Sequence, residues 1–373
     1  MSEELYSRIL GCMVGNALGD AFGGVVEGAS AERVAAIAGG DWVDEFLPYP
    51  ADAGPHPLGI WESSPPRGTG TDDTRYNQIF AECVIRNRGA INSQLLAMEY
   101  IERYRDCATL YPKHVELAEE QFLDRWYEWC CAHLGMDPPS GRPPWVALSQ
   151  GVYGLPGIQG LISLAFAGLL YENEPEKAYV TAFELDFRGV GCSRDATAMM
   201  AAMVSAALGG TISAKEMVRI GLETDPFGLG KRKYDRRVMS SEVSDLLAVA
   251  EEAGHDRALV QALSRRLCHR HFFDPVDVLG FPMAALHFCN GDAIRTIVMA
   301  VNDREFDENG GFVRLRDVDC TGSVAGALVG ALNGAQAFPK DWVDDVISAN
   351  KQVYGIDIEG NARRFYEAVY GAK

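Results

Sequence analysis

The chain has 373 residues, of which 47% are hydrophobic and 23% charged, and its formal net charge at pH 7 is −18. This acidic balance argues against a nucleic-acid partner, because affinity for phosphate backbones comes chiefly from clustered Lys and Arg. The sequence shows neither an apolar run long enough to span a bilayer nor a signal peptide, so we expect no membrane partner and a cytoplasmic location. Its nine cysteines lack zinc-type spacing and are expected to be reduced.

The N-terminal segment predicts a helix over about residues 5–20 that is rich in Gly and Ala. Ser2, followed by two glutamates, is typical of a helix N-cap with an acidic first turn. Glycines lower helix propensity but allow two helix backbones to approach closely, so we expect this helix to be central. Residues 40–70 are rich in proline and have no sustained period, which predicts a long structured loop.

This loop leads into the sequence Gly-Thr-Gly-Thr-Asp-Asp-Thr at positions 68–74. Asp72 and Asp73 are flanked by threonine hydroxyls and come directly before apolar residues at helical spacing. Negative charge is favoured at a helix N-terminus by the helix dipole. One interpretation is an ordinary helix cap with an acidic first turn. The other is a site for a hard cation, because such cations prefer oxygen ligands.

The middle of the chain predicts further helices, with amphipathic runs at 97–104 and 115–129. We interpret the proline-rich stretch 137–145 as a loop inside one domain. A glycine-rich stretch at 151–160 precedes an apolar segment, 161–170, which we predict to be a helix. Glycine amides at a helix start can cradle a phosphate. The basic stretch 225–237 is either a surface loop or an anion-binding loop.

A second acidic cluster, Asp317-Val-Asp-Cys-Thr, runs into an Ala/Gly-rich apolar segment near the C-terminus. Asp317 and Asp319 alternate, so in an extended approach to a helix they would point the same way. If the two clusters meet, four carboxylates repel one another unless cations lie between them. Oxygen ligands favour Mg²⁺ or Mn²⁺ over zinc. The alternative for the second cluster is a solvated loop.

Three blocks of the sequence together resemble the ADP-ribosylglycohydrolase family, of the dinitrogen reductase-activating glycohydrolase type. They are Gly11 to Glu27 (GCMVGNALGDAFGGVVE), Thr71-Asp72-Asp73-Thr74, and Asp317-x-Asp319 before an Ala/Gly helix, in matching order and spacing over nearly the whole chain. The resemblance implies an all-α fold, a single compact orthogonal helical bundle over residues 1–373 with a central metal-binding cleft. It also implies two divalent cations, Mg²⁺ or Mn²⁺, and hydrolysis of an ADP-ribosyl glycosidic bond.

The resemblance also assigns roles by position. Its implied residues are Thr71, Asp72, Asp73, Asp317, Asp319 and Cys320 for metal binding, Glu27, Asp73 and Asp317 for catalysis, and Gly157, Gln159, Gly160, Cys192 and Ser193 for substrate binding. A ribosyl C1 bond breaks through an oxocarbenium-like state, which needs a nearby carboxylate and a positioned water. We expect Glu27 to transfer a proton or to orient that water.

This chain departs from the family pattern at four places. The stretch 157–163 lacks the Asn, the second Gly and the Arg of a Gly-Asn-Gly…Met-Arg pattern, and 191–195 lacks a His. Cys320 stands where a metal-binding Thr is expected, and the approach to the second cluster, 303–316, is longer than usual. These departures alter the surroundings of the substrate more than the carboxylates.

Three functions remain open at this point. The first is a metal-dependent hydrolase that removes ADP-ribose from a protein side chain. The second is a hydrolase of a small ribosylated metabolite or nucleotide, which the changed substrate stretches favour. The third is a non-catalytic relative that binds a ligand, for which Cys320 is the specific hint.

Overall fold

The computed structural model describes residues 2–55, 58–61, 63–122, 126–151, 154–210, 212–231, 233 and 236–371. The elements follow in chain order: α1 (Glu3–Gly24), α2 (Ala31–Ala38), α3 (Asp72–Arg86), α4 (Ser93–Arg105), α5 (Cys107–Leu110), α6 (Val115–Phe122), α7 (Glu128–His133), α8 (Pro144–Ser149), η2 (Ala167–Leu170), α9 (Pro175–Leu185), α10 (Ser193–Leu208), α11 (Ala214–Glu223), α12 (Val238–Glu252), α13 (Asp256–Leu267), α14 (Pro275–Phe288), α15 (Ala293–Ala300), β1 (Arg304–Phe306), β2 (Phe312–Leu315), α16 (Val318–Asn333), η3 (Ala335–Ala337), α17 (Lys340–Tyr354) and α18 (Ile358–Tyr370).

The predicted all-α fold is confirmed. In the described part of the chain the strands β1 and β2 form one antiparallel hairpin, with Arg304 opposite Leu315. Between α2 and α3 no helix interrupts the described residues, which agrees with the predicted long loop. None of the described helices combines the length and apolar character needed to cross a bilayer. The single domain over 1–373 stays a prediction.

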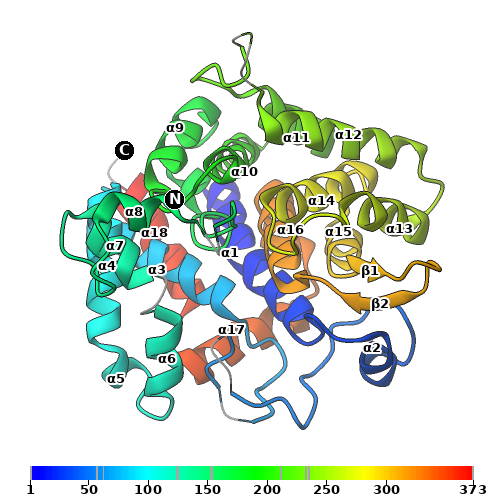
Figure 1. The fold of residues 1–373 in the computed structure, drawn as a ribbon, viewed down its shortest axis with the longest axis horizontal. Helices are drawn as coiled ribbons and strands as arrows, with labels where there is room; N and C mark the ends of the chain where they lie inside the picture. The colour runs from blue at the N-terminus through cyan, green and yellow to red at the C-terminus, as the bar shows by residue number, and fades with distance from the viewer. Residues whose placement is uncertain are drawn as a thin grey trace.

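Helix α1 lies at the centre of the fold beside α16, as Figure 1 shows in blue and orange. The two helices run antiparallel, because Gly11 faces Gly330 and Gly23 faces Val318. At Gly19 an added Cβ would lie 1.8 Å from the carbonyl oxygen of Gly322, so the backbones touch where no side chain fits. The predicted close approach is confirmed, and α1 runs to Gly24, four residues beyond the predicted end.

The predicted helix over 161–170 is wrong. Most of this segment forms successive turns, and only Ala167–Leu170 is a short 3₁₀ helix. The side chain of Asn77 on α3 binds backbone groups that would hydrogen-bond to one another's neighbours in a helix. Its amide donates to the carbonyl of Ile162 (3.0 Å), and its oxygen accepts from the N–H of Ala165 (2.9 Å). A tertiary contact therefore overrides the apolar pattern.

Candidate active site

Asp20, near the end of α1, fixes the start of α3. Thr71 at the N-cap position of α3 makes no capping bond of its own. Instead, the Asp20 carboxylate accepts hydrogen bonds from the N–H (2.9 and 3.0 Å) and hydroxyl (2.7 Å) of Thr71 and from the N–H (2.9 Å) and hydroxyl of Thr74. Burial raises the pKa of Asp20 to about 6, although these hydrogen bonds lower it. Sequence reasoning assigned Asp20 no role.

The glycine loop before α3 is held by the C-terminal helices. The Asn350 side chain donates to the carbonyl of Gly68 (2.9 Å) and accepts from the N–H of Gly70 (3.1 Å). The hydroxyl of Tyr354 donates to the carbonyl of Gly70 (2.9 Å). Gly68 has a φ of 91°, which lies in the region that favours glycine. Segments far apart in sequence therefore place Asp72 and Asp73 at the start of α3.

The second acidic cluster begins α16. Asp317 occupies the N-cap position and Asp319 lies in the first turn, so the predicted extended approach is wrong. Asp319 accepts hydrogen bonds from the hydroxyl of Thr71 (3.2 Å) and from the N–H of Cys320 (2.7 Å). The first of these bonds joins the starts of α3 and α16 directly.

Glu27 is brought to the same place by backbone hydrogen bonds. The N–H of Gly28 donates to the carbonyl of Arg316 (3.2 Å), and the N–H of Leu315 donates to the carbonyl of Ala29 (3.0 Å). The turn after α1 therefore runs along the segment that precedes Asp317. This is why a glutamate outside any helix can reach the carboxylates of α16.

Asp73 of the first acidic cluster lies beside Asp319 of the second, whereas Asp72 belongs to neither close group of ligand atoms. Ligand atoms of Glu27, Asp317 and Asp319 lie within 4.8 Å of one another, and so do those of Asp73, Asp319 and Cys320. Asp319 belongs to both groups and can join them. A solvated loop is excluded for the second cluster, because Asp317 is 6% and Asp319 is 1% exposed.

Burial and mutual repulsion raise the pKa values of these acids. The pKa of Asp317 rises to about 7, and those of Asp73 and Asp319 rise well above the usual range, in each case first because of burial. Burial, with the charges of Asp317, Asp72 and Asp20, also raises the pKa of Glu27. One carboxylate oxygen of Asp73, Oδ1, and one of Asp317, Oδ2, is buried with no hydrogen-bond partner. Unpartnered buried acceptors are costly.

Cys320 faces this cluster. Its thiol donates to Oδ2 of Asp73 at 3.3 Å, and burial beside the carboxylates raises its pKa well above the usual range, so the group is a neutral thiol. Thr321 points elsewhere, as predicted, because its hydroxyl donates to the carbonyl of Ala300 (2.9 Å). No threonine hydroxyl of α16 therefore reaches the position that Cys320 occupies.

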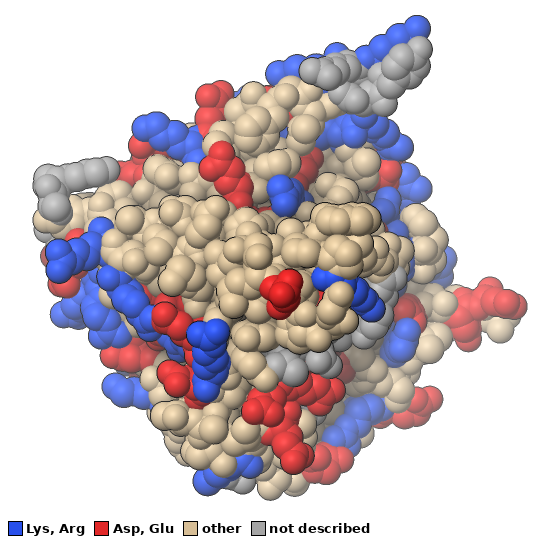
Figure 2. Space-filling model, turned by 60° about the vertical axis from the view of Figure 1, so that its left-hand side comes forward, with Lys and Arg blue, Asp and Glu red and all other residues tan. Residues whose placement is uncertain are grey.

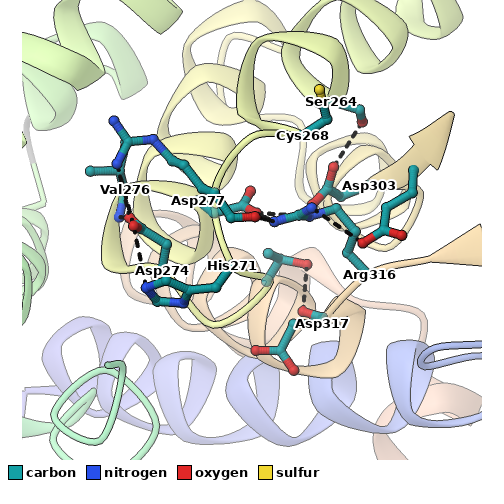
Figure 3. Close-up of polar contacts among 12 residues, drawn as sticks. Ser264, Cys268, His271, Asp274, Val276, Asp277, Asp303, Arg316 and Asp317 are labelled. Atoms are coloured by element: carbon teal, nitrogen blue, oxygen red, sulfur yellow. Dashed lines mark hydrogen bonds and ion pairs between the residues drawn. The ribbon is translucent and has the colours of Figure 1, made fainter. Parts of the chain in front are cut away.

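A second buried group of acids lies directly beside Asp317, as Figure 3 shows. Arg316 donates to Oδ2 of Asp277 through Nε (2.9 Å) and Nη2 (2.6 Å). Its Nε also lies 3.3 Å from Oδ2 of Asp303, which in turn accepts from the hydroxyl of Ser264 (2.7 Å) through Oδ1. Sequence reasoning missed this group, because its members come from α13, α14 and the two residues that flank the β1–β2 hairpin.

The predicted substrate-binding residues form two sets, at 157–160 and at 192–193. Gly160 packs tightly, since an added Cβ would lie 2.0 Å from the hydroxyl of Thr197, and no helix follows it to form the expected phosphate cradle. Cys192 lines a cavity of about 480 Å³ at the start of α10, and the hydroxyl of Ser193 is buried without a hydrogen-bond partner. In the described part of the chain, neither set forms a hydrogen bond or ion pair with the site carboxylates.

The described residues of the basic stretch, 225–231, 233 and 236–237, lie between α11 and α12, and Figure 2 shows basic side chains on this segment at the top. Arg237 turns inward, where it is 2.9 Å from Asp195, while Arg236 pairs with Glu242 at 2.8 Å. Two of its arginines are therefore neutralised by acids of the same chain. This favours a surface loop over an anion-binding loop.

Comparison with known proteins supports the family and the all-α fold. The ADP-ribosylglycohydrolase family model matches residues 1–373, whereas no curated protein sequence matches the chain. A solved structure described as an ADP-ribosylglycohydrolase-related protein complex is similar, with a TM-score of 0.62 and 22% identity over 98% of this chain and 99% of that one. At this identity the likeness supports the fold alone. Because the family model spans the whole chain, the protein belongs to the ADP-ribosylglycohydrolase family and is a glycoside hydrolase.

Proposed function

We propose that the protein removes ADP-ribose from a modified protein side chain with the help of two divalent cations, Mg²⁺ or Mn²⁺. The proposed ligands are Thr71, Asp72, Asp73, Asp317, Asp319 and Cys320, and the proposed catalytic residues are Glu27, Asp73 and Asp317. The observation that carries this proposal is the convergence of buried carboxylates from α3 and α16. A cytoplasmic location belongs to the same proposal.

The residues present fit hard cations. Oδ1 of Asp73 and Oδ2 of Asp317 are buried acceptors without donors, and the surrounding donor set is mainly oxygen. Asp319 contributes to both close groups of ligand atoms, which suits a pair of ions. Bound cations would neutralise these carboxylates, hold the ribose 2′- and 3′-hydroxyls and orient a water.

Glu27 is the proposed residue for proton transfer. Its carboxylate lies with those of Asp317 and Asp319, whose ligand atoms are within 4.8 Å of one another, and burial raises its pKa, which favours the protonated form that can donate a proton. Partial exposure, unlike the full burial of Asp73, leaves Glu27 open to a substrate. Its place at the edge of the cluster suits a group that orients an attacking water toward the anomeric carbon of the ribose.

The proposed reaction is tested with ADP-ribosylated peptides. The purified protein is incubated with peptides carrying ADP-ribose on arginine or on serine, and the release of free ADP-ribose is measured by chromatography. We expect release that stops on metal chelation and returns on addition of Mg²⁺ or Mn²⁺. Release that survives complete metal removal would contradict the proposal, and so would a lack of release from every peptide.

A small ribosylated metabolite is the second candidate substrate. It is favoured by the sequence departures from the family pattern at 157–163 and 191–195, and Cys192 in the second of these stretches lines a cavity of about 480 Å³. Competition between an ADP-ribosylated peptide and free ribosylated nucleotides separates the two candidates. Hydrolysis of the nucleotide with no effect on the peptide would establish the second one.

A further inference from the structure

A cavity of about 290 Å³ lies outside the proposed active site, between α13, the β1–β2 hairpin and the segment that follows α2. Its walls include Trp42, Arg257, Gln261, Arg304, Phe306 and Phe312. The hairpin belongs to the segment 303–316, which none of the proposed chemistry uses. Aromatic side chains and guanidinium groups thus meet in a cavity of a chain whose net charge is −18.

Arg304 is the buried positive charge of this cavity. Only 5% of the residue is exposed, and its guanidinium donates to the carbonyl of Asn302 (2.9 Å), to the amide oxygen of Asn302 (2.7 Å) and to the carbonyl of Asp41 (3.0 Å). All three acceptors are neutral, and no carboxylate of the described residues forms an ion pair with it. Buried charges are normally paired, so this group is suited to an anion from outside the chain.

The aromatic walls hold the guanidinium groups in place. The centre of the Arg304 guanidinium lies 4.5 Å from the ring centroid of Phe312 and 5.3 Å from that of Trp42. Arg257 lies 4.8 Å from the Trp42 centroid, and Arg265 lies 5.2 Å from the centroid of Phe306. Stacking on the rings leaves the guanidinium edges for hydrogen bonds. At Arg304 each nitrogen already donates once within the chain, so one further hydrogen on each Nη is left for a phosphate oxygen.

Arg257, the second arginine that lines the cavity, can exchange its ion pair with Asp41 for one with a bound phosphate. Arg257 pairs with the carboxylate of Asp41 at 2.9 Å, and the two side chains are 54% and 63% exposed. Ion pairs this exposed contribute little to stability, so a phosphate can replace Asp41 at low cost. The amide of Gln261 offers both a donor and an acceptor to the edge of a heterocycle.

We propose that this cavity binds a nucleoside monophosphate, with its phosphate on Arg257 and Arg304 and its ring among Trp42, Phe306 and Phe312. The volume of about 290 Å³ is close to the lower end of ligand pockets, about 300 Å³, which suits a ligand of this size. The cavity lies close to the carboxylate cluster along the chain. Arg304 follows Asp303, which contacts Arg316, and Arg316 precedes Asp317 of the cluster. The cavity is nevertheless built from different residues.

The experiment follows Trp42 by fluorine NMR of the full chain labelled with 5-fluorotryptophan. The protein has six tryptophans, and Trp42→Phe assigns the resonance of Trp42. Adenosine monophosphate is titrated in the presence of a chelator, with adenosine and ribose 5-phosphate as the two partial ligands. We expect saturable movement of the Trp42 resonance with adenosine monophosphate, and at least tenfold weaker binding of both partial ligands.

Two variants on α13 locate the bound phosphate. Arg257→Gln is expected to weaken binding of adenosine monophosphate about tenfold, as loss of one charged contact does. Arg266→Gln is the matched control, because Arg266 pairs with Asp245 and does not line the cavity, so its binding should equal that of the wild type. Asp73→Asn should also keep the Trp42 response, which separates this cavity from the carboxylate cluster.

Three results would overturn the proposal. The first is a Trp42 resonance that adenosine monophosphate does not move. The second is equal binding by wild type and Arg257→Gln. The third is loss of the response in Asp73→Asn, which would place the nucleotide at the carboxylate cluster instead.

Discussion

Two groups of buried carboxylates meet at the Arg316–Asp317 peptide bond, and their charges are balanced differently; Figure 3 shows the first group together with Asp317. On one side Asp277 and Asp303 share the guanidinium of Arg316 at 2.6 and 3.3 Å. On the other side, Asp73, Asp317 and Asp319 form no ion pair with an arginine or lysine of the described chain. All of these acids are at most 6% exposed.

The difference shows that some buried acids are neutralised by an arginine of the chain, whereas others have no positive partner and are suited to bind a cation. Arg316 is next to Asp317 in sequence and still lowers its pKa, yet the guanidinium is turned away toward Asp277 and Asp303. Those two acids therefore keep a positive group out of the carboxylate cluster. What remains in the cluster is unneutralised negative charge, which a divalent cation can balance.

Arg316→Met should be the most damaging substitution for stability. It leaves Asp277 and Asp303 buried without a positive partner, and breaking a buried pair in this way costs about 3–5 kcal/mol. Urea unfolding of the metal-free protein measures the loss. Arg314→Met is the control, because Arg314 forms an exposed pair with Glu305 and should cost less than about 1 kcal/mol. Equal losses in the two variants would contradict the structural role of Arg316.

Asp73→Asn should lower activity and metal affinity without lowering stability, unlike Arg316→Met. Activity should fall at least about a hundredfold, which corresponds to about 2.7 kcal/mol, and the affinity for Mg²⁺ or Mn²⁺ should fall with it. The metal-free variant should be at least as stable as wild type, because one of several repelling charges is removed. Calorimetric metal titration and urea unfolding test both points. A less stable variant that still binds metal normally would remove the distinction between the two groups.

Helical spacing and glycine content are local signals, so the sequence predicted helices and a close approach of α1 to a neighbour; the shared site of the two acidic clusters was implied by the family resemblance. Sequence reasoning could not assign Asp20, whose five hydrogen bonds to Thr71 and Thr74 exist only once α1 and α3 are packed. The sequence did contain one sign that Asp20 has a structural role. Asp20 directly follows Gly19 in a predicted helix that has a glycine at every fourth position from Gly11 to Gly23. A charge in such a tightly packed face must point toward a partner.

The error at 161–170 has a similar cause. Its apolar residues are compatible with a helix, but Asn77 binds the backbone of Ile162 and Ala165, and Arg188 donates to the carbonyl of Gln159 (3.4 Å) and the hydroxyl of Ser163 (2.6 Å). Those side chains replace the helical hydrogen bonds that the pattern predicted. The Arg316 network was equally hidden, since its acids come from distant segments.

The pH dependence of stability should separate the two groups further. Burial and the neighbouring Asp303 raise the pKa of Asp277 well above the usual 3.8, so the folded state holds a proton that the unfolded state has lost above about pH 4. Stability of the metal-free protein should therefore fall as pH rises from 4 toward the folded pKa, by about 1.4 kcal/mol per unit for one proton.

Asp277→Asn removes this contribution, because Asp303 alone can then pair with Arg316 in its charged form. Its stability curve should be flatter than that of wild type over the same pH range. Urea unfolding at pH 5, 6 and 7 checks the difference in slope. Parallel curves for the two proteins would mean that Asp277 and Asp303 do not share a proton.

The smallest expected effect concerns Cys320 and the strength of one cation position. A neutral thiol is a poor ligand for a hard cation, and Thr321 cannot replace it because its hydroxyl is bound to the carbonyl of Ala300. Cys320→Thr should therefore strengthen metal binding severalfold, by less than about 1.4 kcal/mol. The control is Cys289→Thr, a buried cysteine that contacts Met299 instead of the carboxylates. Calorimetric titration with Mn²⁺ decides the question, since unchanged affinity and stoichiometry in Cys320→Thr would show that position 320 holds no ligand.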